Sequence, residues 1–459
     1  MEIRKVRKAE SIFSRVLEEI KPSAVETDAT IASINIVISK LAKIVDKGVE
    51  LKVVGSVARG TNLKGDGDID VFVLFHKNTS KEELVRKGLA YGKKLAGGKR
   101  DRYEIKYAEH PYIRLYLNEL GMKMDLVPAL RIDEIGEMGT AVDRTPLHTN
   151  FINSHLTEKQ RDDTRLLKYM LKAHNIYGAE VKTGGFPGYL CELLVYQYGS
   201  LLRFLDNASL FEKPVILDPK TKDKINDPKL VKKFNSEFIV IDPVDADRNV
   251  AAGVSPESFA RFVMVSREFV KRPDVSLFFG KGFSSLSAAS LIRKFIKNSG
   301  LSLYLVKARV PGKSEDVVWP QLRKKAGIIS DTLSRYDYPV FFSIQWVSDN
   351  NGFMLFVLPF SEVETRMLKG PDVFIRNAAE NFVKEHPKAI GTVIKGSNLN
   401  LLEKNRYRSA ESLFRAIIGG KLIKNQKDID LRSAKLFVNT VPREYSEDAY
   451  AELMKRLRI

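Results

Sequence analysis

Three aspartates stand in a pattern that can hold divalent metal ions. Asp68 and Asp70 lie two residues apart in a run rich in β-branched and aromatic residues, which predicts a strand over 68–75. Because side chains alternate along a strand, both carboxylates would share one face while Ile69 points into the core. Carboxylate oxygens suit hard cations, and two cations about 3.5–4 Å apart can catalyse phosphoryl transfer. Asp125, on a strand predicted over 122–127, would complete the set.

A phosphate-binding turn is predicted just before these aspartates. A short strand over 51–54 ends at Gly55, where the missing Cβ lets the backbone approach a ligand closely. Ser56 offers a hydroxyl, and a helix beginning after it would present free N–H groups to a phosphate. Arg59 adds a planar donor fork for phosphate oxygens. The sequence therefore predicts a nucleoside triphosphate beside the carboxylates.

The acidic run over 66–70 has two other interpretations, an EF-hand loop and a solvated strand edge. An EF-hand loop beginning at Asp66 is excluded, because its required glycine would fall at Val71 and its terminal glutamate at Lys77. A solvated strand edge explains a lone pair of aspartates better than a metal site does. The Gly-Ser run, which is separated from Asp68 by eleven residues, together with a third acidic strand, favours the metal site.

The chain carries an excess of positive charge. Its 459 residues include 75 Lys and Arg against 57 Asp and Glu, a formal net charge of +18. This favours polyanionic partners, although charge alone leaves a basic protein without nucleic acid equally open. Cys191 is the one cysteine, which excludes a disulfide framework and a cysteine-rich zinc site. No long apolar run and no N-terminal apolar segment is present, which predicts a cytoplasmic protein that does not enter a membrane.

The elements around these residues change in character along the chain. Helices are predicted over about 5–47, followed by short strands that make an α+β unit ending near 148. Capped helical patterns and a loop-rich stretch over 206–243 follow, and an α-β-α-β-β run begins near 286. The helices predicted in the second part cover 157–175, 189–205 and 256–271. The strands predicted in the third part cover 302–310, 340–347 and 353–360.

Several motifs together resemble a known family. Gly55-Ser56 followed by Asp68-Ile69-Asp70 resembles the signature of the polymerase β nucleotidyltransferase superfamily. Further runs resemble the archaeal, class I CCA-adding enzymes, most densely between about 50 and 270. These runs cover 107–112, 141–148, 176–180, 188–194 and 244–252. The other class reads bases with a Glu-Asp-x-x-Arg run, and the nearest string here, beginning at Glu315, has Trp319 in place of the arginine.

The resemblance implies an α+β multidomain fold with a polymerase β-like nucleotidyltransferase head, a helical central domain and a small α/β, RRM-like tail module. The head would span 1–148. The central domain, binding nucleotide and tRNA, would span 149–299 plus about 385–459. The tail, over 300–384, would contact tRNA.

The resemblance also implies a reaction and its cofactors. C, C and A would be added in turn to the 3′ end of tRNA, from CTP and ATP and without a template, releasing pyrophosphate. Asp68, Asp70 and Asp125 match the catalytic, metal-binding triad for two Mg²⁺ ions, with Asp68 where the class often has Glu. Asp68 and Asp70 would bridge both ions, and Asp125 would hold the ion at the nucleophile. tRNA, ATP and CTP are the implied partners, and a homodimer stays open.

A nucleotide pocket follows from the same resemblance, and its residues also have plainer explanations. Arg161, Arg165, Lys168 and Lys172 share one face of a helix, which a solvated surface would also explain. Arg248 would read base edges, or it is a surface arginine beside Asp245 and Asp247. His110 and His148 would otherwise only pack or orient turns, and Tyr189 and Cys191 are expected in the core. The predicted nucleotide-binding residues are Ser56, Arg59, His110, Thr145, Lys168, Tyr177 and Arg248.

Other functions remain as alternatives. A poly(A) or uridylyl transferase shares the metal-site pattern, but the runs over 244–252 and after 300 favour the CCA-adding family. A non-catalytic RNA-binding relative is disfavoured because all three carboxylates are present. A basic membrane-surface protein is the most distant alternative, since no cationic amphipathic helix dominates the sequence.

Overall fold

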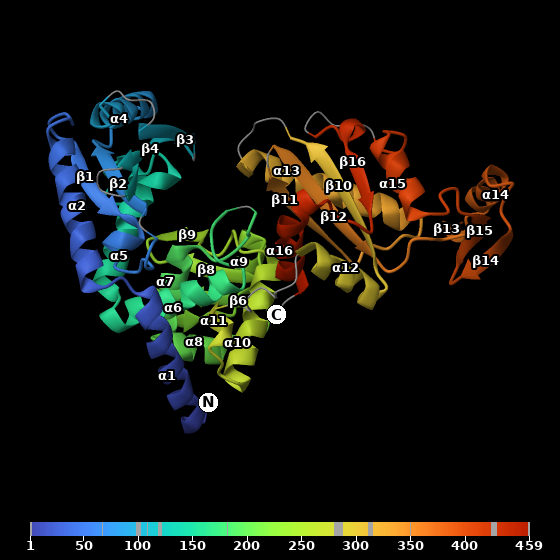
Figure 1. The fold of residues 1–459 in the computed structure, drawn as a ribbon, viewed down its shortest axis with the longest axis horizontal. Helices are drawn as coiled ribbons and strands as arrows, with labels where there is room; N and C mark the ends of the chain where they lie inside the picture. Colours follow the sequence, from blue (N-terminus) through green and yellow to red (C-terminus); the bar gives the residue numbers. More distant parts are fainter. Residues whose placement is uncertain are drawn as a thin grey trace. The chain divides into compact units, whose positions relative to one another are not determined.

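The computed structural model describes residues 2–457, apart from 67, 98–101, 108, 118–121, 181, 280–287, 311–314, 349 and 424–428. The chain divides into two compact units, residues 1–281 and 282–458. Figure 1 colours the first unit from blue to yellow and the second from orange to red. Within the described residues, every helix is too short or too polar to cross a lipid bilayer.

The first unit begins with a mixed five-stranded sheet in the order β1-β2-β5-β4-β3. The strands β2 and β5 run parallel, and the other neighbours are antiparallel. Ile69, Val71, Val73 and Phe75 of β2 face a core that α2 and α4 cover, as the predicted alternation requires. The strands are β1 (Glu50–Val54), β2 (Asp68–Phe75), β3 (Tyr103–Tyr107), β4 (Pro111–Leu117) and β5 (Met122–Leu130). The helices are α2 (Ala24–Ala42), the one-turn α3 (Gly55–Ala58), α4 (Lys81–Leu95), and the 3-10 helices η3 (Ile135–Glu137) and η4 (Ala141–Arg144).

Helices around an apolar core make the rest of the first unit. The helix predicted over 189–205 is two helices, because Gly199 takes a left-handed backbone (φ 79°) and Ser200 caps a new helix. The stretch predicted as loop-rich, 206–243, contains three strands of a small sheet in the order β7-β6-β8-β9, and β9 follows that stretch; the strands are only two to five residues long. The helices are α1 (Ile3–Ile20), α5 (Thr145–His155), α6 (Glu158–Ala173), α7 (Gly188–Tyr198), α8 (Leu201–Ala208), α9 (Pro228–Phe234), α10 (Pro256–Lys271) and α11 (Ser276–Phe279). The strands are β6 (Val215–Asp218), β7 (Asp223–Lys224), β8 (Phe238–Asp242) and β9 (Asp245–Asn249).

The second unit contains an antiparallel four-stranded sheet in the order β11-β12-β10-β16. With α13 after β10 and α15 before β16, it follows the β-α-β-β-α-β connection of ferredoxin-like folds. Tyr304 and Phe356 face α13 and α15, whereas Leu305 and Phe353 face α12 and α16. An RRM uses one face of its sheet to stack bases, and here both faces are covered. The strands are β10 (Ser302–Arg309), β11 (Phe342–Ser348), β12 (Asn351–Leu358) and β16 (Lys435–Val438). The helices are α12 (Ala288–Ser299), α13 (Glu315–Arg335), α15 (Ala410–Ile418), α16 (Ser446–Leu457), and the 3-10 helices η5 (Leu431–Ser433) and η6 (Arg443–Tyr445).

A smaller sheet is inserted between β12 and α15. Its order is β13-β15-β14, and α14 packs on β13. The segment 385–459, which we had expected in the central domain, instead contributes two strands of this insert and β16, which pairs with β10. Strand pairing within the second unit thus decides where this segment lies. The insert's elements are β13 (Thr365–Asp372), α14 (Arg376–Glu385), β14 (Gly391–Lys395) and β15 (Asn398–Lys404).

Candidate active site

The structure brings Asp70 and Asp125 side by side across the parallel strands β2 and β5. Their Cα atoms are register partners, and Asp68 lies two residues earlier on β2. Arg114 of β4 holds the Asp125 carboxylate through two hydrogen bonds of 2.7 Å, from Nε to Oδ1 and from Nη2 to Oδ2. Among the described residues, no three His, Cys, Asp or Glu side chains are grouped closely enough to hold a metal ion. The aspartates share one region of the sheet, while the Asp125 carboxylate faces Arg114.

The electrostatics of this region favour a cation. Burial raises the pKa of Asp70 to about 7, and the charges of Asp125 and Asp68 add to the rise, which Arg59 opposes. Carboxylate oxygens that repel one another in this way are the preferred ligands of a hard divalent ion, which would offset their charge. The donor set therefore fits Mg²⁺, with Arg114 as a competing partner of Asp125.

Gly55 makes room for Asp70. It follows the last residue of β1 and begins α3 with a left-handed backbone of φ 77°, which glycine adopts without steric cost. A Cβ atom added there would lie 2.1 Å from Oδ2 of Asp70, far inside van der Waals contact. The Ser56 carbonyl accepts a hydrogen bond of 2.9 Å from the Thr61 N–H, which closes the turn behind it. The predicted close approach at Gly55 is thus present, toward a carboxylate of the same chain.

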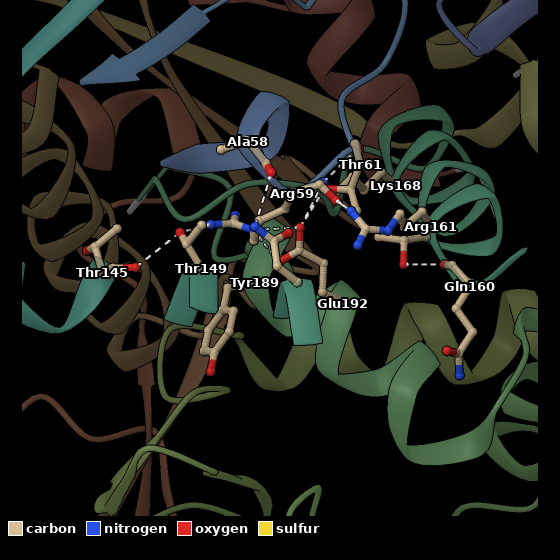
Figure 2. Close-up of polar contacts among 12 residues, drawn as sticks. Ala58, Arg59, Thr61, Thr145, Thr149, Gln160, Arg161, Lys168, Tyr189 and Glu192 are labelled. Carbon is tan, nitrogen blue, oxygen red and sulfur yellow. Dashed lines mark hydrogen bonds and ion pairs between the residues drawn. The ribbon is translucent and has the colours of Figure 1, made fainter. Parts of the chain in front are cut away.

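A buried charge network lies behind this turn (Figure 2). The Glu192 side chain is fully buried on α7 and accepts hydrogen bonds from Arg59 Nε, at 3.0 Å, and from the Thr61 hydroxyl. Lys168 Nζ donates to the Thr61 carbonyl and hydroxyl, both at 3.0 Å, and lies 3.7 Å from Glu192. Burial alone would raise the pKa of Glu192, but the charges of Arg59 and Lys168 lower it below its ordinary 4.5. The carboxylate is therefore ionised at neutral pH and holds the turn in place.

The basic face of α6 is not a solvated surface. Arg161 donates to the Arg59 carbonyl, Arg165 Nε donates to the Asn62 carbonyl at 2.9 Å, and Lys168 binds Thr61 as described. These contacts tie α6 to the turn over 59–62. The shared face was predicted correctly. Of the explanations left open for it, a solvated surface does not hold for these three residues, because their side chains satisfy backbone carbonyls of a segment about 100 residues earlier in the chain.

Tyr177 lies next to Lys168. A Cβ added to Gly188, at the start of α7, would be 3.2 Å from the Tyr177 hydroxyl and 3.5 Å from Cε of Lys168. Burial raises the pKa of Tyr177, so its hydroxyl stays protonated and able to donate. The structure thus brings together Arg59, Lys168 and Tyr177, three of the predicted nucleotide-binding residues.

A second cluster, the Asp242 cluster, consists of Asp242, His148, Tyr189 and Arg248. Oδ2 of Asp242 lies 2.8 Å from Nε2 of His148 and 2.8 Å from Nη1 of Arg248. Oδ1 accepts from the Tyr189 hydroxyl at 3.2 Å. Tyr189, expected in the core, is only partly buried and stacks on His148 with ring centroids 4.0 Å apart. Cys191 is fully buried, as expected.

Comparisons with known proteins match most of the chain. The nucleotidyltransferase domain profile matches residues 37–148, the second domain of tRNA nucleotidyltransferase matches 162–279, and the C-terminal domain of CCA-adding enzyme matches 299–426. A CCA-adding enzyme of Methanocaldococcus jannaschii is 35% identical over 93% of this chain and 95% of its own length. The chain belongs to the CCA-adding enzyme family. Further members from Sulfurisphaera tokodaii and Thermococcus gammatolerans are 36% and 33% identical, over 88% and 97% of this chain and 91% and 98% of their own. A solved structure of the Cid1 poly(U) polymerase is 16% identical over 59% of this chain and 98% of its own, with a TM-score of 0.48.

Thr145 and His110, two further residues that were predicted to bind nucleotide, lie outside the group of Arg59, Lys168 and Tyr177. Thr145 begins α5, and its carbonyl accepts from Thr149, whose hydroxyl in turn accepts from Arg59 Nη1 at 3.4 Å (Figure 2). His110 lies in the turn before β4, 4% exposed, and its Nε2 has no hydrogen-bond partner among the described residues. Thr145 is therefore linked to the Arg59 network, whereas the buried Nε2 of His110 is left available.

Glu192 and Asp242 were missed by sequence reasoning. Glu192 interrupts the apolar run of α7, and Asp242 ends the apolar strand β8. A carboxylate is almost never fully buried unless it is paired, so an acidic residue within an apolar helix or strand indicates a buried ion pair. Arg59 and His148 could not be recognised as partners from the sequence, because they lie 133 residues from Glu192 and 94 residues from Asp242.

Proposed function

We propose that this chain is a CCA-adding enzyme, which adds C, C and A in turn to the 3′ end of tRNA from CTP and ATP without a template. The observation that carries the proposal is the register of Asp70 with Asp125 on parallel strands, with Asp68 beside them and Gly55 leaving room. Family membership supports the tRNA substrate. The net charge of +18 suits a polyanionic partner. We place the enzyme in the cytoplasm, where these substrates meet.

Asp68, Asp70 and Asp125 would hold two Mg²⁺ ions. When bound, such ions lower the pKa of an attacking hydroxyl and stabilise a leaving pyrophosphate. The tRNA 3′-oxygen forms a bond to the α-phosphorus, the bond between the α- and β-phosphates breaks, and the hydroxyl proton passes to solvent. The protein's part is to place the two substrates in line and to neutralise the growing charge on the phosphates.

The predicted nucleotide-binding residues would contact different parts of the nucleotide. Ser56, Arg59, Lys168 and Tyr177 lie around one turn and would contact the triphosphate, and His110 and Thr145 would line the pocket. Arg248 would read the base. Residues 1–148 would form the catalytic head, the helical part after it would bind nucleotide and tRNA, and the second unit would contact tRNA.

A single incorporation assay tests the proposal. Purified full-length protein with Mg²⁺ receives labelled CTP or ATP and tRNA that ends at the discriminator base, or one or two cytidines beyond it. Label from CTP should enter the first two substrates and label from ATP the tRNA that already carries both cytidines. No incorporation would favour the non-catalytic alternative, and a long tail built from ATP alone would favour a poly(A) polymerase. Mature tRNA ending in CCA is the control and should stay unlabelled.

Gly55→Ala should cut nucleotide addition about a hundredfold, because a misplacement of a reacting group by about 1 Å costs that much. The new Cβ would push the Asp70 carboxylate aside. Gly65→Ala is the matched control: its backbone has φ 78°, and nothing lies within 4 Å of the added Cβ. Both variants should lose roughly 1–2 kcal/mol of stability to the left-handed backbone, measured by thermal unfolding. Equal loss of activity in the two variants would contradict the role of Gly55.

A further inference from the structure

Asp242 is a buried carboxylate whose two oxygens both accept hydrogen bonds. Its side chain is 0% exposed at the end of β8. Oδ2 accepts from His148 and Arg248, and Oδ1 accepts from Tyr189 and from the Val244 N–H at 3.1 Å. Burial alone would raise its pKa, but the hydrogen bonds from His148, from Arg248 and from the Val244 N–H lower it below the ordinary 3.8. Asp242 is therefore an anion that draws together residues from α5, α7 and β9.

Arg248 is held at one end only. Its Nη1 is bound to Asp242, while its side chain is 31% exposed. Within the described part of the chain, the other guanidinium N–H groups have no protein partner. An arginine fork has five donors in a fixed plane, so fixing one nitrogen fixes the direction of the rest. The hydrogen bond to Asp242 thus orients the unbound N–H groups of Arg248.

His148 and Tyr189 keep Asp242 in position. Burial lowers the pKa of His148 below its ordinary 6.5, so the ring is neutral at neutral pH and its Nε2 carries the hydrogen that Asp242 accepts. The Tyr189 ring stacks on the imidazole while its hydroxyl binds the other carboxylate oxygen. Because both of its oxygens accept hydrogen bonds, the carboxylate is held in one orientation. This fixes the position of the Arg248 guanidinium that is bound to it.

We propose that Asp242 is a specificity-determining positioning residue, which holds the Arg248 fork in the orientation that accepts cytosine and adenine and rejects uracil and guanine. The proposal rests on the proposed CCA addition and names the residue behind its base choice. On the edge used for base pairing, N3 of cytosine and N1 of adenine are acceptors, whereas the same atoms of uracil and guanine carry hydrogen. A donor fork in a fixed place therefore pairs with the first two bases and opposes the other two. A mobile fork would lose this distinction.

The test is the ratio of correct to incorrect incorporation by Asp242→Asn. The asparagine keeps the size of the side chain but removes its charge, and its NH₂ group cannot accept from Arg248. Initial rates are measured with CTP against UTP, and with ATP against GTP, on the matching tRNA acceptors. We expect the two kcat/KM ratios to fall roughly tenfold to a hundredfold, the discrimination that one well-placed fork supplies. The inhibition constant of pyrophosphate, which has no base, should change little.

Two comparisons keep the result specific. Asp247→Asn removes a charge next to Arg248, but Asp247 is exposed and pairs with Lys233, so its ratios should match the wild type. If Asp242 acts through Arg248, adding Asp242→Asn to Arg248→Ala should change the ratios no further. Additive losses in the double variant, or equal loss for all four nucleotides in Asp242→Asn, would overturn the proposal. Failure of the wild-type protein to incorporate any nucleotide would instead refute the proposed function.

Discussion

Asp68→Ala and Asp70→Ala should abolish nucleotide addition and leave the affinity for tRNA nearly unchanged. The two carboxylates lie on β2, which pairs with the strand of Asp125, and burial together with the like charges of Asp125 and Asp68 raises the pKa of Asp70 to about 7. Loss of one metal-holding carboxylate removes several kcal/mol of transition-state stabilisation, so we expect a rate loss on the order of a thousandfold or more. Single-turnover incorporation of labelled CMP measures the rate, and filter binding of labelled tRNA measures the affinity.

Asp66→Ala is the control for this pair of variants. Asp66 precedes the same strand, but its carboxylate is half exposed and pairs with Lys172. The substitution should leave both rate and affinity close to wild type. Loss of tRNA binding in step with activity in Asp68→Ala or Asp70→Ala would show that the carboxylates serve folding rather than catalysis.

Glu192→Ala should be the most destabilising single substitution among those considered. It would leave Arg59 and Lys168 buried without their shared anion, and breaking such a pair costs about 3–5 kcal/mol. In thermal unfolding this corresponds to a fall of roughly 10 °C in the midpoint for a domain of this size. Since Arg59 and Lys168 both hold the turn beside Asp70, KM for CTP and ATP should also rise.

The pH dependence of this effect has a definite sign. The pKa of Glu192 is lowered in the folded protein, so its contribution is complete above the ordinary value of 4.5. It is lost as the pH falls through the lower, folded value, and the difference between wild type and Glu192→Ala should shrink below pH 4.5. Glu237→Ala, which breaks an exposed pair with Lys213, is the control and should leave the midpoint nearly unchanged. A comparable loss in that control would contradict the assigned importance of the buried network.

Local patterns predicted the elements that carry the chemistry. The alternation around Asp70 predicted β2 with its bounds, and the Thr157 capping box predicted the beginning of α6. Such signals depend on residues within one turn or one strand, where propensity and periodicity decide the structure. The break at Gly199 was missed because an apolar run hides a left-handed glycine.

Only the tertiary structure decided which charges are buried together and which surfaces stay open. Glu192 and Asp242 meet their partners across 133 and 94 residues, and their burial depends on those partners being present. Likewise, the α-β-α-β-β run indicated an RRM-like module, but in the structure α12 and α16 cover the second face of its sheet. The sequence by itself therefore determined the three aspartates, their strands and the reaction class. The tertiary structure determined how the surrounding arginines and lysines are held, because the energy of a buried charge is set by neighbours that no local pattern specifies.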